Sequence, residues 1–61
     1  MLHYNLYKGN LGEDIVECDR ASLHAVQQYF LDDGYCISQV FCYDANTVFI
    51  KVWKEVKEKN D

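Results

Sequence analysis

The chain has 61 residues, enough for one small domain that can bury only about 60% of the surface of its unfolded form. Its hydrophobic content of 49%, with nine aromatic residues, three glycines and no proline, argues against disorder and against a linker that divides the chain. We therefore expect a single domain over residues 1–57 and a frayed, charged tail over 58–61.

The net charge of −4 is unevenly distributed. Residues 1–50 carry two basic side chains against seven acidic ones, whereas residues 51–61 carry four lysines against three acidic side chains. A nucleic-acid-binding domain normally presents a basic patch on its folded body, so this acidic body argues against direct binding of nucleic acid. The same body would suit a basic surface on another protein.

Targeting signals are not evident in the sequence. The first residues have neither a basic nor an apolar run, and no apolar stretch approaches the roughly 20 residues that span a bilayer. The odd number of cysteines, three, indicates free thiols in a reducing environment. We expect a cytoplasmic protein with no membrane contact.

The first third of the chain predicts a β-hairpin. Apolar and polar residues alternate over 2–7, which is typical of a strand, and residues 8–12 contain two glycines that could adopt positive φ in a turn. A short second strand is expected over 14–18, antiparallel to the first.

A helix is predicted over residues 20–32. The carboxylate of Asp19 is expected to cap its first turn, and Gly34 to end it in the left-handed conformation. The apolar residues at the spacing of one helix face are Leu23, Val26 and Phe30.

A second hairpin is predicted from the β-rich runs 35–43 and 47–56, joined by the loop 44–46. If Asn46 takes the left-handed position of a three-residue loop, each residue of the first strand pairs with the residue of the second strand whose number completes a sum of 90. A two-residue loop would shift this register by one residue. The expected fold is α+β: a β-β-α-β-β domain with an antiparallel sheet of three to four strands and one helix packed on one face.

The second hairpin has two apolar faces, and a single helix can cover only one of them. The aliphatic face, with Val40, Val48, Ile50 and Val52, is expected beneath the helix. The predicted aromatic face consists of Tyr35, Ile37, Phe41, Tyr43, Phe49 and Trp53. An exposed apolar cluster of this size normally marks an interface, although the N-terminal strands or the C-terminal tail could also cover it.

We therefore predict a non-enzymatic protein-binding module that acts through this aromatic face, as a homodimer or with a larger target. An acidic patch of Asp32, Asp33 and Asp44 could contribute, although capping and turn formation also explain these residues. The alternative function is an acidic inhibitor, of the kind that phages encode, that occupies a basic site on a nucleic-acid enzyme.

Catalytic, cofactor and metal sites are not predicted. Cys36 and Cys42 lie six residues apart in one strand, about 20 Å, and therefore cannot share a metal or a disulfide. Cys18 could approach His24, but the pair lacks a third orienting group, and buried, inert cysteines are expected instead. The carboxylates of residues 13–19 are expected to be solvated, since so short a chain cannot build a deep cleft around them.

Overall fold

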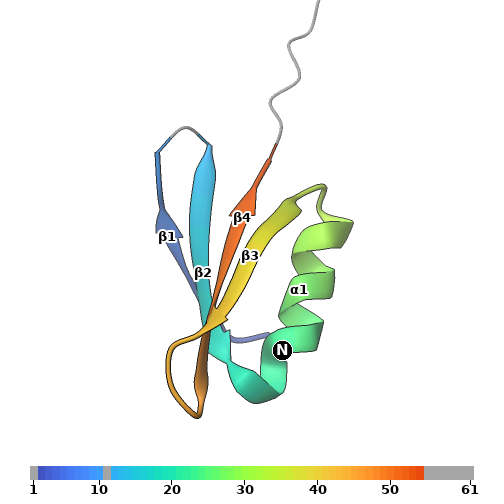
Figure 1. The fold of residues 1–61 in the computed structure, drawn as a ribbon. Coiled ribbons are helices and arrows are strands. Elements are labelled where there is room, and N and C mark those ends of the chain that lie inside the picture. Colours follow the sequence, from blue (N-terminus) through green and yellow to red (C-terminus); the bar gives the residue numbers. More distant parts are fainter. Residues whose placement is uncertain (1, 11, 55–61) are drawn as a thin grey trace, which may run out of the picture.

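The computed structural model describes residues 2–10 and 12–54, which form a four-stranded sheet and one α-helix (Figure 1). In chain order the elements are β1 (Tyr4–Lys8), β2 (Glu13–Asp19), the 3-10 turn η1 (Arg20–Ser22), α1 (Leu23–Asp32), β3 (Cys36–Cys42) and β4 (Thr47–Trp53). The predicted β-β-α-β-β fold is confirmed. The predicted tail over 58–61 and the end of the predicted 47–56 strand lie outside the described residues.

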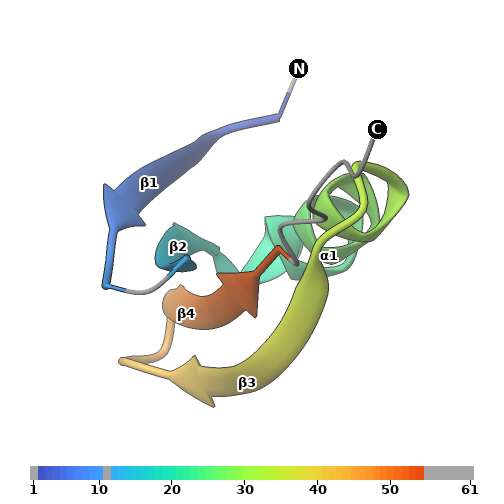
Figure 2. The same ribbon diagram turned by 90° about the horizontal axis from the view of Figure 1, so that it is seen from above.

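All neighbouring strands are antiparallel, and their order across the sheet is β1-β2-β4-β3. Each hairpin contributes one central strand, so that β2 and β4 pair over seven residues. The sheet is strongly curved, and α1 lies on one side of it (Figure 2). The N-terminal strands therefore extend the sheet and do not fold across its second face.

The core forms between the central strands and the helix. Every second residue of β2 and β4 turns toward α1, and the facing pair Val16 and Ile50 is completely buried. From the helix, Val26 and Phe30 are buried and Leu23 is partly buried against them, as the helical spacing predicted. The buried residues of the core are Val16, Cys18, Val26, Phe30, Val48, Ile50 and Val52.

The helix begins differently from the prediction. Asp19 has an extended backbone, with φ −71° and ψ 149°, and its side chain makes no capping hydrogen bond. Instead, the backbone N–H of Arg20 donates to the carbonyl oxygen of Asn46 at 2.8 Å. The first free N–H of the helical segment is thus satisfied by the β3–β4 loop and not by a side chain.

The helix ends in the Schellman motif. Gly34, with φ +92°, lies in the predicted left-handed conformation, and its N–H donates to the Leu31 carbonyl at 3.1 Å. The N–H of Tyr35 donates to the Phe30 carbonyl at 2.9 Å, and the two rings meet edge to face with centroids 5.2 Å apart. These bonds and the ring contact together satisfy the last carbonyls of the helix and fix the entry into β3.

We expect Gly34→Ala to lower the free energy of unfolding by about 1–2 kcal/mol, because an L-residue at positive φ brings its Cβ too close to the backbone. Chemical denaturation followed by circular dichroism measures the change. Gly34→Asn is the control and should cost less, since asparagine tolerates this conformation better. Equal losses for both variants would contradict the backbone explanation.

The register of β3 against β4 changes at Ser38. Residues 39–42 follow the predicted pairing, with Phe41 opposite Phe49, but Ile37 lies opposite Val52 because of a β-bulge between Ile37 and Gln39. One extra residue in a strand turns every residue on its far side to the opposite face. The predicted pairings of Cys36, Ile37 and Ser38 are therefore wrong, whereas the predicted partner of Tyr35 lies outside the described residues.

Two predicted members of the aromatic face consequently lie on the helix side. Ile37 and Tyr35 pack against the buried core, and the Tyr35 ring contacts Phe30. The Tyr35 ring also lies 4.9 Å from the Nζ of Lys54, which pairs with Asp33 at 3.7 Å. These contacts connect the end of β4 to the end of the helix.

The helix covers the central strands better than the edges. Leu6 of β1 and Val40 of β3 turn toward the helix side, yet they remain 40% and 38% exposed. The helix runs along the strands (Figures 1 and 2), and its diameter of about 10–12 Å is too small to shield both edges of four strands spaced about 4.8 Å apart. Val40 therefore lies on the predicted side of the sheet, but the helix does not bury it as predicted.

We expect Val48→Ala to lower the free energy of unfolding by about 2 kcal/mol, since it removes two methyl groups from a fully buried site. Val40→Ala is the matched control. It deletes the same atoms on the same side of the sheet and should cost less than about 1 kcal/mol, because Val40 is already 38% exposed. Thermal and urea unfolding compare the two variants, and equal losses would contradict the burial described above.

Candidate protein-binding face

The side of the sheet away from α1, here called the outer face, is built by the register of all four strands. No segment among residues 2–10 and 12–54 lies over it (Figures 1 and 2). Its side chains form four rows across the strands: Glu13, Trp53 and Cys36; Tyr7, Ile15, Lys51 and Gln39; Asn5, Glu17, Phe49 and Phe41; and Asp19, Thr47 and Tyr43.

An aromatic cluster of Phe41, Tyr43 and Phe49 occupies the part of the outer face next to the β3–β4 loop. Phe41 and Phe49 are stacked with centroids 5.8 Å apart, and Tyr43 meets Phe49 edge to face at 5.5 Å. Phe41 is 40% exposed and Tyr43 is 71% exposed. The cluster thus offers preformed, partly exposed rings to a partner.

Trp53 lies on the same face but not in this cluster. It is four residues along β4 from Phe49, about 13 Å at the rise of a strand, and Lys51 lies between them. Of the six predicted aromatic-face residues, the structure therefore brings three together, places Trp53 apart, and turns Tyr35 and Ile37 to the helix side.

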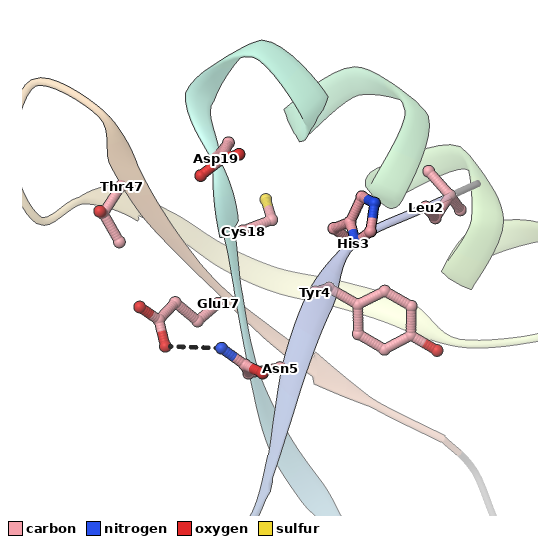
Figure 3. A pocket seen from close by; sticks show the side chains of 8 residues that line it. All are labelled: Leu2, His3, Tyr4, Asn5, Glu17, Cys18, Asp19 and Thr47. Carbon is pink, nitrogen blue, oxygen red and sulfur yellow. Dashed lines mark hydrogen bonds between the residues drawn. The ribbon is translucent and has the colours of Figure 1, made fainter.

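A pocket opens between the start of β1 and the end of β2, next to Thr47 of β4 (Figure 3). Its volume is about 270 Å³, and its polar lining comes from Asn5, Glu17, Asp19 and Thr47, with His3 at its N-terminal side. In Figure 3 the side chains of Leu2 and Tyr4 turn toward the helix, whereas those of Asn5 and Glu17 meet on the other side of the strands. The pocket is thus lined from both faces at this end of the sheet, and Glu17 and Asp19 are its acidic residues.

The Glu17 carboxylate is held in place by two donors from β1. The Tyr7 hydroxyl donates to its Oε1 at 2.8 Å, and the Asn5 amide donates to the same oxygen at 3.5 Å. The hydrogen bond to the carboxylate and its negative charge raise the pKa of Tyr7. Neither Glu17 nor Asp19 forms an ion pair within the described part of the chain.

The predicted acidic patch is not assembled. Asp32 and Asp33 lie at the end of α1, whereas Asp44 lies in the β3–β4 loop at the opposite end of the molecule (Figure 1). Asp33 pairs with Lys54, and Asp32 accepts a hydrogen bond from the Gln28 amide at 3.0 Å. These local contacts offset the unfavourable position of two anions at a helix C-terminus.

Asp44 has a structural role in the β3–β4 loop. Its Oδ1 accepts hydrogen bonds from the backbone N–H groups of Asn46 and Thr47, both at 2.8 Å. These bonds favour the ionised form and lower the pKa of Asp44. The carboxylate therefore shapes the loop whose Asn46 carbonyl receives the helical segment.

The three cysteines are free, and their environments differ. Cys18 is buried, and burial, followed by the charges of Asp19 and Glu17, raises the pKa of its thiol. Cys36 and Cys42 are exposed, which corrects the prediction that all three are buried. In residues 2–10 and 12–54, no group of three or more histidine, cysteine, aspartate and glutamate side chains could hold a metal ion.

We expect Ellman's reagent to modify two thiols per native chain quickly, those of Cys36 and Cys42, and the Cys18 thiol only slowly. Both burial and the raised pKa keep Cys18 protonated and inaccessible. Unfolding in urea should release the third thiol, and Cys18→Ala should remove this slow phase. Three equally fast thiols in the folded protein would be inconsistent with the structure.

Several outer-face residues were not among the predicted site residues: Tyr7, Ile15, Glu17, Asp19 and Lys51. The alternation in the first hairpin shows which of its residues share a face. It does not show that this face continues the aromatic one, because that depends on the pairing of β2 with β4.

Comparison of the chain with protein-family models, with curated proteins and with solved structures finds no match. Within the part of the chain that the structure describes, no helix is long and apolar enough to cross a membrane.

Proposed function

We propose that this chain is a small protein-binding module and that its outer face is the binding surface. The observation that carries the proposal is the exposed aromatic cluster of Phe41, Tyr43 and Phe49 on a sheet face that no other described segment covers. Partly exposed aromatic residues on a rigid scaffold are the usual anchors of protein interfaces.

The distribution of apolar side chains over the two faces of the sheet supports this proposal. The helix already buries the aliphatic side of the central strands, including Val48, Ile50 and Val52. The aromatic cluster is therefore not needed to complete the core of the domain. A small domain has little stability to spare, so apolar residues kept outside the core are best explained by burial against another chain.

The contacts within the cluster also suit a binding role. Phe49 is half-buried and supports both Phe41 and Tyr43 through ring contacts. Side chains that are already held in place lose less conformational entropy on association. The proposal includes either a second copy of this chain or a larger protein as the partner.

We expect the double variant Phe41→Ser/Tyr43→Ser to weaken partner binding at least about tenfold, since it removes the exposed anchors of the cluster. Immobilised wild-type chain is incubated with an extract of its source organism, and retained proteins are quantified by mass spectrometry. Light scattering after size exclusion tests self-association of the 7.2 kDa chain in parallel.

The control variant is Leu6→Ser/Leu31→Ser, which removes two exposed apolar residues that do not lie on the outer face. It should retain the same partner as the wild type, and circular dichroism should show all three proteins folded. Equal retention by both double variants, or a monomer that retains no protein, would refute the outer face as the binding surface.

A further inference from the structure

We infer that the partner of the outer face is a basic protein segment in which an arginine lies beside an aromatic or aliphatic residue. The arginine would bind at Glu17 and Asp19, and the apolar neighbour would pack on the aromatic cluster. This inference rests on the proposed function and identifies the chemistry of the partner.

The first argument is the charge of the outer face. Among residues 2–10 and 12–54, its ionised residues are one lysine, Lys51, and three carboxylates, Glu13, Glu17 and Asp19, which add up to a net charge of −2. Two copies stacked through this face would bring two negative surfaces together, at a cost that increases when water is excluded. Charge complementarity therefore favours a basic partner over a second copy.

The second argument is the position of the charges within the face. Glu17 lies directly opposite Phe49 across β2 and β4, and Asp19 lies opposite Thr47 in the next row. The carboxylates and the aromatic cluster are therefore neighbours, and one short segment crossing the strands could contact both. Lys51 lies one row further along, on the side of Phe49 away from Asp19.

The third argument is that these carboxylates have no cation of their own in the described residues. The ion pairs there are those of Lys8 with Asp14 and of Lys54 with Asp33. Arg20 follows Asp19 in the chain, but its guanidinium donates to the Ala45 carbonyl at 3.4 Å. A partner's cation would thus meet an accessible pair of carboxylates, one of which is already oriented by Tyr7 and Asn5.

Arginine fits this arrangement better than lysine. Its planar guanidinium can donate two parallel hydrogen bonds to a carboxylate and can also stack on an aromatic ring. The pocket beside Glu17 has a volume of about 270 Å³ and is open to solvent, so a long side chain can enter it. The nearby ring of Phe49 offers the apolar contact that the stem of the side chain needs.

Two capped dipeptides test the inference with the full chain. The probe is N-acetyl-phenylalanyl-arginine amide, and its neutral isostere is N-acetyl-phenylalanyl-citrulline amide. Each is titrated into ¹⁵N-labelled protein, and amide shifts in residues 15–19 and 47–49 are followed by NMR. The arginine probe should bind about tenfold more tightly, which corresponds to one charge-assisted interaction.

The variant Glu17→Gln/Asp19→Asn should abolish this tenfold difference between the two probes. Its matched control is Asp32→Asn/Asp33→Asn, which changes the net charge of the chain equally but alters the end of α1. The control should keep the difference. Increasing salt should weaken the arginine probe more than the citrulline probe in the wild type.

Equal affinity of the two probes for the outer face would overturn the inference, although apolar binding would still support the proposed function. Persistence of the difference in Glu17→Gln/Asp19→Asn would also overturn it, because the arginine would then bind elsewhere. If neither probe shifts the outer face, the inference fails, and the extract experiment with Phe41→Ser/Tyr43→Ser decides the proposed function separately.

Discussion

The fold depends on the antiparallel pairing of β2 with β4. This pairing joins two hairpins that lie at opposite ends of the chain and creates both faces of the sheet at once. Toward the helix it aligns Val16 with Ile50 in the core, and away from the helix it aligns Glu17 with Phe49. The pairing of β2 with β4 therefore both makes the core continuous and places the acidic part of the outer face beside its aromatic part.

The local features of the fold could be predicted because local signals determine them. The helix stops at Gly34 because glycine readily adopts positive φ, and its inward residues follow from helical spacing. The loop before Thr47 follows from turn preferences. The start of the helix could not be predicted in the same way. Its first N–H binds the carbonyl of Asn46, which is distant in sequence.

The candidate site could be predicted only in part. Phe41, Tyr43 and Phe49 lie close to the loop, where the predicted register holds. Tyr35 and Ile37 lie beyond the bulge, where each residue turns to the face opposite to the one that strict alternation predicts. The contribution of Glu17 could not be predicted, because its place beside Phe49 arises from tertiary strand pairing and not from sequence spacing.

The bulge at Ser38 also has a consequence for the edge of the sheet. β1 and β3 are the edge strands of the sheet, and an unpaired edge is a template on which further strands can add. A bulge twists the edge of β3 and interrupts its regular hydrogen-bonding groups, while β1 offers only five residues. Both edges are therefore poorly suited to strand addition, even though the sheet carries exposed aromatic rings.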